Sequence, residues 1–221
     1  MDRKNLKKLS VTAMFSAIAF IITFAFRFNV SFLTFDFKVA IISILAFLYG
    51  PLYGIASSAV VTFLEYISVS DTGIYGLIMN FLATGGFALV CGVTYKFKRS
   101  FSGAILSVIL STIIVTALML AGNIVITPIY MNVPVEAVYE MIPTLLLPFN
   151  ICKGIINGAL LLIIYKPLTA PLKKSGLINV NDTAKYTISK KTVLLIIFSA
   201  LAIVLAVLYL LLIMKGNFQI F

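Results

Sequence analysis

Histidine and tryptophan are absent from the 221-residue sequence, and it contains only two cysteines, Cys91 and Cys152. Without histidine, and with no close cysteine spacing, the chain lacks the patterns of a zinc site or a histidine-dependent catalytic triad. It also lacks a glycine-rich nucleotide loop. We therefore predict that the protein is not an enzyme and holds neither a metal nor a resident cofactor. Both cysteines lie in apolar stretches, so we interpret them as packing residues.

Charged residues are scarce as well, at 11% of the chain, whereas 62% of the residues are hydrophobic and the mean hydropathy is +1.13. A soluble globular domain has an apolar share of roughly 45–50%. The composition therefore predicts an all-α polytopic membrane protein. In a membrane protein, the first explanation to test for the net charge of +10 is the positive-inside rule, by which basic residues are enriched on the cytoplasmic side.

Seven apolar stretches are candidates for membrane-spanning helices. The apolar run from 38 to 69 is divided at Gly50-Pro51, because two helices here leave all the basic clusters on one side of the membrane. Bulky residues after the first stretch provide no signal-peptide cleavage site, so we interpret that stretch as a retained span. The predicted spans are about 9–27, 38–50, 51–69, 74–95, 102–127, 147–165 and 192–214, with a cytoplasmic linker from 176.

Basic residues are unevenly distributed between the two ends of these spans. The basic clusters at 3–8, 96–99 and 166–191 fall on one side, and Asp71, Glu136 and Glu140 mostly on the other. The positive-inside rule then places the N-terminus in the cytoplasm and residues 215–221 outside. We predict a multi-pass protein of the cell membrane, with a loop at 27–38 and a longer outer loop at 130–141.

Polar side chains interrupt the apolar stretch at 147–165. A helix beginning near Pro148 places Asn150, Lys153 and Asn157 on one face, within about 60°. A lysine at the middle of a span costs about 2.5–3.5 kcal/mol, so by default it faces a cavity or a partner. Lys153 could instead extend to the lipid headgroups, although this leaves the asparagines unexplained.

Further polar and aromatic residues gather on the predicted outer half. Asn123 and Asn80 join Asn150 and Lys153, and the loop at 28–37 alternates polar residues with phenylalanines. This set suits a flat, neutral or weakly anionic ligand. The loop could equally be an interfacial aromatic belt, and Asn80 could simply bond a neighbouring helix.

The first span carries small residues, Ala13 and Ala17, on one face. Such a face allows close approach by a helix of another protein or of the same chain, and the pattern alone does not separate the two.

Several motifs together resemble the riboflavin-specific substrate-binding (S) component of energy-coupling-factor (ECF) vitamin transporters, over roughly residues 5–175. They are Ala13-x-x-x-Ala17, Phe32 to Lys38, Leu48 to Ile55, Met79-Asn80-Phe81, Asn123 through Pro128 to Tyr130, and Leu147-Pro148-Phe149-Asn150-x-x-Lys153-Gly154. The last is the most specific.

This resemblance implies a six-helix bundle, to which 192–214 adds a C-terminal transmembrane helix. It implies capture of riboflavin from outside, and docking through Ala13 and Ala17 on a transmembrane coupling protein driven by two ATPases. It also implies that Asn123, Asn150 and Lys153 bond the flavin, with Asn80 a further candidate. The residues that enclose the flavin ring would be Phe32, Leu33 and Phe35.

Three alternatives remain at this point. The ligand could be another vitamin or flavin mononucleotide. Lys153 could be the catalytic residue of a small membrane enzyme. A self-sufficient secondary transporter would need ionisable coupling residues at mid-membrane, for which Glu65 is the nearest candidate.

Overall fold

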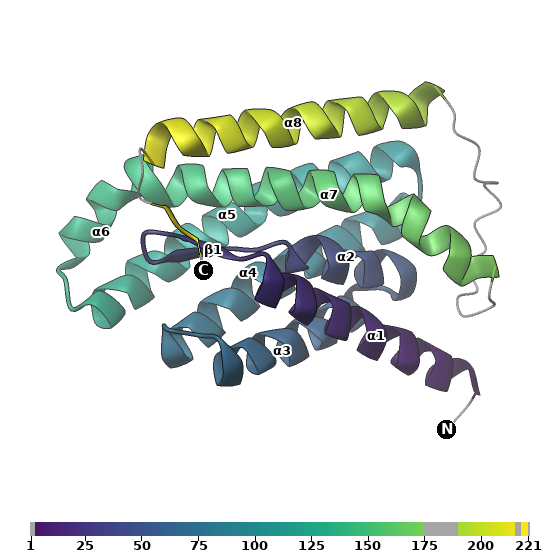
Figure 1. Cartoon of the computed structure of the whole chain (residues 1–221), viewed down its shortest axis with the longest axis horizontal. Coiled ribbons are helices and arrows are strands. Elements are labelled where there is room, and N and C mark those ends of the chain that lie inside the picture. Colours follow the sequence, from purple (N-terminus) through teal and green to yellow (C-terminus); the bar gives the residue numbers. More distant parts are fainter. Residues whose placement is uncertain (1–2, 175–189, 215–217, 221) are drawn as a thin grey trace.

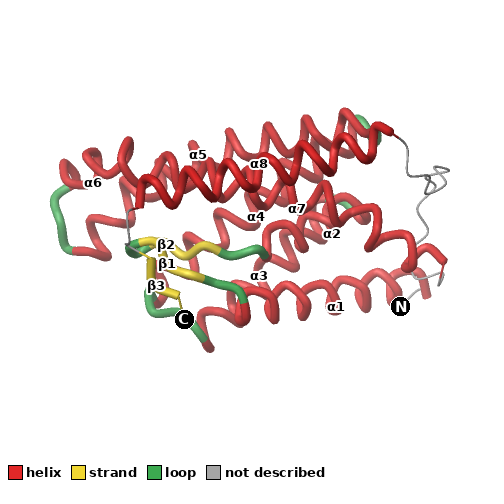
Figure 2. Tube along the Cα trace, turned by 45° about the horizontal axis from the view of Figure 1, so that its top comes forward, coloured by secondary structure: helices red, strands yellow, loops and turns green. Residues whose placement is uncertain are grey.

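The structure, a computed structural model, describes residues 3–174, 190–214 and 218–220. Helices lying roughly along one direction form the body of the molecule (Figure 1), and three short strands meet in one small sheet (Figure 2). The elements are α1 (Arg3–Ala25), β1 (Phe28–Val30), β2 (Leu33–Phe35), α2 (Lys38–Tyr49), α3 (Pro51–Ser68), α4 (Gly73–Phe97), α5 (Phe101–Met131), α6 (Val135–Met141), the π-helix η1 (Ile142–Leu146), α7 (Leu147–Lys174), α8 (Lys190–Met214) and β3 (Phe218–Ile220).

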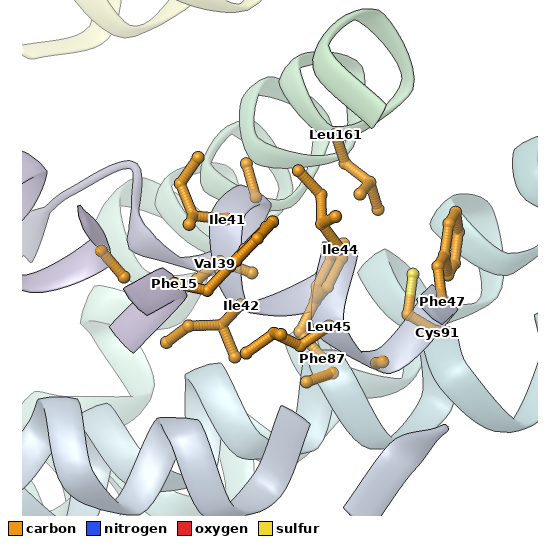
Figure 3. Packing of buried hydrophobic residues seen from close by; sticks show 14 of the residues in the cluster. Phe15, Val39, Ile41, Ile42, Ile44, Leu45, Phe47, Phe87, Cys91 and Leu161 are labelled. Atoms are coloured by element: carbon orange, nitrogen blue, oxygen red, sulfur yellow. The ribbon is translucent and has the colours of Figure 1, made fainter. Parts of the chain in front are cut away.

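Helix α2 is the core of the bundle. Every residue from Lys38 to Leu48 is buried, as expected for a helix that is apolar on all sides. Its side chains contact residues of α1, α4 and α7 (Figure 3). Phe47 also stacks on Tyr95 of α4, with ring centroids 4.0 Å apart. The predicted span 38–50 is therefore an internal helix of 12 residues, enclosed by its neighbours.

The break predicted at Gly50-Pro51 coincides with the junction between α2 and α3. Gly50 has a φ angle of 100°, which side chains other than glycine rarely adopt. Pro51 is the first residue of α3, a position where its missing N–H costs nothing. The chain can therefore reverse direction between two helices with one intervening residue.

The segment before α7 differs from the prediction. Helix α7 begins at Leu147, next to Pro148 as predicted, but the chain is already helical from Val135 through α6 and η1, so 130–141 is not simply a loop. The N–H of Leu147 donates to the carbonyl of Ile142 in a wider π turn. Such a turn can accommodate a proline, which has no N–H to donate.

The segment at 27–38 also has more structure than the predicted loop. Strands β1 and β2 form an antiparallel hairpin that pairs Phe28 with Phe35 and Val30 with Leu33. Ser31, in the two-residue turn, has a φ angle of 56°, consistent with the left-handed geometry of tight hairpin turns. Strand β3 pairs with the other edge of β1.

Among the described residues, four helical stretches are long and apolar enough to cross a membrane, namely Asn5–Ala25, Gly73–Phe97, Ser102–Met131 and Val135–Tyr165. Two further apolar stretches, Lys38–Tyr49 and Ile196–Leu210, are shorter. The all-α, multi-pass character is thus confirmed, whereas the count of seven spans remains a prediction. Most of the predicted linker, 175–189, lies outside the described residues.

Candidate functional site

A cavity of about 80 Å³ lies between the hairpin and helices α4, α5 and α7. We call it the outer cavity. The structure brings six of the predicted ligand-binding residues to its wall: Phe32, Leu33, Asn80, Asn123, Asn150 and Lys153. Its other lining residues are Thr34, Thr72, Tyr75, Gly76, Met79, Ala83, Met119, Ile126, Thr127, Tyr130 and Phe149. The wall therefore combines aromatic and aliphatic surface with a few polar groups, as ligand sites commonly do.

Lys153 points into the protein and not toward lipid. Its Nζ donates to the carbonyl of Thr34 at 2.8 Å and to Oδ2 of Asp36 at 2.9 Å. An ammonium carries three N–H groups, so these two bonds leave a third donor on a side chain that lines the cavity. The same contacts join α7 to the hairpin.

Asp36 is the centre of a buried charge network made of Asp36, Lys38, Glu65 and Lys153. Its Oδ2 also accepts from Nζ of Lys38 at 3.0 Å, and Lys38 donates to Oε2 of Glu65 at 2.8 Å. Burial by itself raises the pKa of the Asp36 carboxyl. The ammonium groups of Lys153 and Lys38 outweigh burial and lower the pKa to about 2. The four groups pair two cations with two anions, which offsets much of the cost of burying each.

The buried asparagines are held by bonds to nearby backbone or side-chain groups. Nδ2 of Asn123 donates to the carbonyl of Met119 at 2.7 Å, and its Oδ1 accepts from Thr127 at 2.8 Å. Nδ2 of Asn150 donates to the carbonyl of Leu146 at 2.8 Å. These bonds fix the orientation of each carboxamide at the cavity wall before any ligand arrives.

Asn157 shares the polar face of α7 but supports the site indirectly. Its Oδ1 accepts from the N–H of Ala40 at 3.2 Å, and its Nδ2 donates to the carbonyl of Asp36 at 2.9 Å. The Ala40 N–H lies in the first turn of α2, where helical partners are lacking. Asn157 therefore caps α2 and holds in place the backbone of Asp36, two residues before the helix begins.

Phe35 lies apart from the outer cavity. It is fully buried, stacks on Phe28 with ring centroids 4.9 Å apart, and meets the edge of Phe149 at 5.9 Å. Adjacent strand residues point to opposite faces, so Phe35 and Thr34 lie on opposite sides of the hairpin, and Thr34 lines the cavity whereas Phe35 does not.

A second, more polar hollow of about 240 Å³ adjoins the outer cavity. The two share Phe32, Thr34, Thr72, Asn80 and Tyr130 in their walls. The remaining wall of the polar hollow consists of Thr23, Arg27, Asn29, Ser31, Glu65, Val69, Ser70 and Asp71. Hydroxyl, amide and charged groups thus face the space beside the more apolar outer cavity.

The small residues of α1 face outward. Ala13 and Ala17 are exposed, whereas the adjacent Ser16 is buried and shares a hydrogen bond of 2.7 Å with Ser57 of α3. Within the described residues, helix α1 therefore packs on α3 through another face and leaves the two alanines uncovered.

The sequence does not reveal the partners of Lys153. Asp36 precedes it by 117 residues, and by pattern it is only one of several polar residues in a loop. A signal was present, since Asp36 and Lys38 stand beside an apolar stretch in which unpaired charges would be costly. Glu65 was considered as a coupling residue but not as the partner of Lys38.

Three comparisons with known proteins agree with one another. A family model described as "ECF transporter, substrate-specific component" matches residues 7–169. Riboflavin transporter RibU of Staphylococcus aureus is 34% identical over 185 residues, which cover 79% of this chain and 96% of that protein. Riboflavin transporter FmnP of Bacillus subtilis is 36% identical over 166 residues, which cover 69% and 86%. A solved structure of the S component of a bacterial ECF transporter is similar with a TM-score of 0.65 and 33% identity, covering 76% of this chain and 99% of that one.

Proposed function

Because the chain belongs to the family of substrate-specific components of ECF transporters, we propose that it captures riboflavin at the outer face of the membrane for ATP-driven uptake. Family membership makes it a transport component and not an enzyme. Relatives that carry the name riboflavin transporter support this ligand. The observation that carries the proposal is the outer cavity, where Asn123, Asn150 and Lys153 converge.

The chemistry of the wall suits a flavin. The isoalloxazine ring is flat, with apolar faces and an apolar dimethylbenzene end, and its pyrimidine edge carries carbonyl and ring-nitrogen acceptors for an ammonium and carboxamides. Phe32, Leu33 and Phe149 provide surface against which such a ring can lie. The adjoining polar hollow offers hydroxyl and amide partners to a ribityl chain.

The proposed orientation follows from the charges. The start of α1 and the end of α7 lie at one end of the molecule, and the hairpin and α6 lie toward the other (Figure 1). The basic residues of the described segments 3–8, 96–99, 166–174 and 190–191 lie at the first end, which we assign to the cytoplasm. The outer cavity then opens toward the outside, where the vitamin is captured.

We further propose that residues 1–175 form the vitamin-binding domain of six helices, and that 176–221 add a linker and one more transmembrane helix. The partners would be a transmembrane coupling protein and two ATPases, as the family description implies. The exposed Ala13 and Ala17 of α1 support docking on that coupling protein, because small residues allow close helix contact.

Titration of the purified protein with riboflavin tests the ligand. We expect saturable quenching of riboflavin fluorescence, and competition by flavin mononucleotide then ranks the two flavins. Absence of both quenching and co-purified flavin would contradict the proposal. Riboflavin uptake by vesicles that contain this chain alone, without ATPases, would contradict the proposal that ATP drives uptake.

Replacement of the ammonium tests the site. Lys153→Ala removes a charge-assisted hydrogen bond, so we expect riboflavin affinity to fall by about 1.5–3 kcal/mol, or roughly 10- to 100-fold. Lys96→Ala, at an exposed lysine at the end of α4, is the matched control and should bind as the unmodified protein does. Equal affinities would remove Lys153 from the site.

A further inference from the structure

A second hydrophobic cluster joins the hairpin to helix α8. It contains buried residues from the hairpin, from the beginning of α7 and from the second half of α8, and is separate from the main core around α2. Its buried members are Val30, Phe35, Phe149, Cys152, Ile156, Ala206 and Leu210. Residues at the outer cavity and residues of the C-terminal helix thus meet in one packed unit.

The hairpin has two different faces. Val30 and Phe35 are 0% exposed and lie in this cluster. Asn29 and Thr34 form a cross-strand pair on the other face, where Oγ1 of Thr34 donates to Oδ1 of Asn29 at 3.0 Å. The carbonyl of Thr34 is also an acceptor for Lys153. Helix α8 therefore shares a packed cluster, together with the beginning of α7, with the same strands whose polar face borders the ligand site.

Strand β3 secures the hairpin a second time, at its edge. The strand order is β2-β1-β3, with Asn29 opposite Gln219 and Val30 opposite Phe218. Figure 2 shows the three strands together at the end of the molecule that carries α6. An isolated two-stranded hairpin is at best marginally stable in water, and a third strand or a packed face stabilises it. Here the cluster shared with α7 and α8 supplies the packed face, and β3 supplies the third strand.

We propose that the C-terminal segment, α8 with β3, holds the hairpin closed over the outer cavity and so lengthens the time for which the ligand stays bound. The proposal rests on the proposed function for its ligand. The family model ends at residue 169, before α8 begins. This C-terminal clamp, α8 with β3, therefore lies outside the part of the chain that the family model matches.

The test compares three variants of the 221-residue chain with the unmodified chain in lipid nanodiscs. A variant ending at Met214 lacks β3. Leu210→Ala removes a buried side chain from the cluster, whereas Leu208→Ala truncates a leucine on the same helix that is 49% exposed and serves as the matched control. Riboflavin dissociation is followed by recovery of flavin fluorescence, and amide hydrogen exchange of residues 28–35 is measured without ligand.

We expect faster dissociation, by about tenfold, from the variant ending at Met214 and from Leu210→Ala, with little change in association rate. Hairpin amides should exchange faster in the same two variants, and Leu208→Ala should match the unmodified protein in both measurements. Unchanged dissociation and unchanged exchange in both variants would overturn the clamp. If the unmodified protein binds no riboflavin, the proposed function fails, and hydrogen exchange alone still decides whether the C-terminal segment restrains the hairpin.

Discussion

Lys153 and Asp36 show how a charged residue is kept inside an apolar protein. An uncompensated charge in such surroundings costs several kcal/mol, and pairing with good geometry recovers much of it. Oδ2 of Asp36 accepts from Lys153 at 2.9 Å and from Lys38 at 3.0 Å. One carboxylate oxygen therefore serves two ammonium groups, and its loss would affect both.

Asp36→Asn should be among the most harmful single changes in the chain. It leaves Glu65 as the one carboxylate of the charge network for two ammonium groups, so we expect the free energy of unfolding to fall by about 3–5 kcal/mol. Riboflavin affinity should fall as well, because Lys153 loses an anchor. Thermal unfolding and fluorescence titration measure the two effects. Glu136→Gln, at an exposed acid on α6 that lines neither cavity, is the control, and an equally small effect of both changes would contradict this view of the network.

The acid sensitivity of the Asp36 contribution follows from its pKa. The ordinary value is 3.8 and the folded value is about 2, so the carboxylate stabilises the folded state fully above the ordinary value and loses its contribution as the pH falls through about 2. The difference in unfolding free energy between the unmodified protein and Asp36→Asn should therefore be constant from about pH 8 to pH 5. Denaturant unfolding at several pH values measures this difference. A decline centred near neutral pH would show that another ionisation controls it.

At the residue scale, the sequence shows that a charged side chain in an apolar stretch requires bonding partners, but it does not show which residues these partners are. A lysine flanked by Asn150 and Asn157 in an apolar stretch must be satisfied inside the protein, and the structure places all three inward. The groups that bond Lys153 are set by the fold, because Asp36 lies 117 residues earlier in the chain and meets Lys153 only when the hairpin segment packs against α7. Phe35 illustrates the same limit, because the face of a short strand depends on a register that the sequence did not reveal.

Among the helices, α5 and α7 approach each other closely beside the site. A Cβ atom added at Gly154 would lie 2.6 Å from Cγ2 and 2.9 Å from Oγ1 of Thr112. Such distances are shorter than atoms tolerate without movement. Gly154 follows Lys153 directly, so the helix contact also sets the position of the ammonium.

Gly154→Ala should push α7 away from α5. Overpacking of this kind typically costs about 1–3 kcal/mol, and we expect a similar loss in the free energy of unfolding together with weaker riboflavin binding. Gly86→Ala provides a milder control, since the nearest side-chain atom to an added Cβ there is 3.3 Å away, on Leu118. Thermal unfolding and flavin titration test both variants. Equal effects would mean that the α5 and α7 contact has no special role.

At the scale of the whole molecule, the sequence indicated an apolar helical bundle and its internal break correctly, because both follow from composition and from Gly50-Pro51. It could not show that α2 is enclosed by its neighbours, since an internal helix and a lipid-facing helix have the same composition. The helical stretch from Val135 was also missed. Prolines at 143 and 148 normally end helices, whereas here Pro143 lies within the π-helix Ile142–Leu146 and Pro148 follows it in α7.

The proposed orientation can be tested with single cysteines. Cys91 and Cys152 are both buried, so background labelling should be low. We expect Asp71→Cys, in the exposed turn before α4, to react with a membrane-impermeant maleimide in intact cells. Arg99→Cys, in the exposed turn after α4, should react only after the cells are opened. The reverse pattern would invert the topology.

The pairing in the charge network has an electrical consequence. Each elementary charge moved across the membrane potential requires about 2.3 kcal/mol of work per 100 mV. Lys153 and Lys38 together carry the charge that Asp36 and Glu65 cancel, so displacement of these four groups as a unit transfers no net charge. An uncharged cargo adds none. Cells that are energised and cells that are depolarised would therefore load such a site equally well.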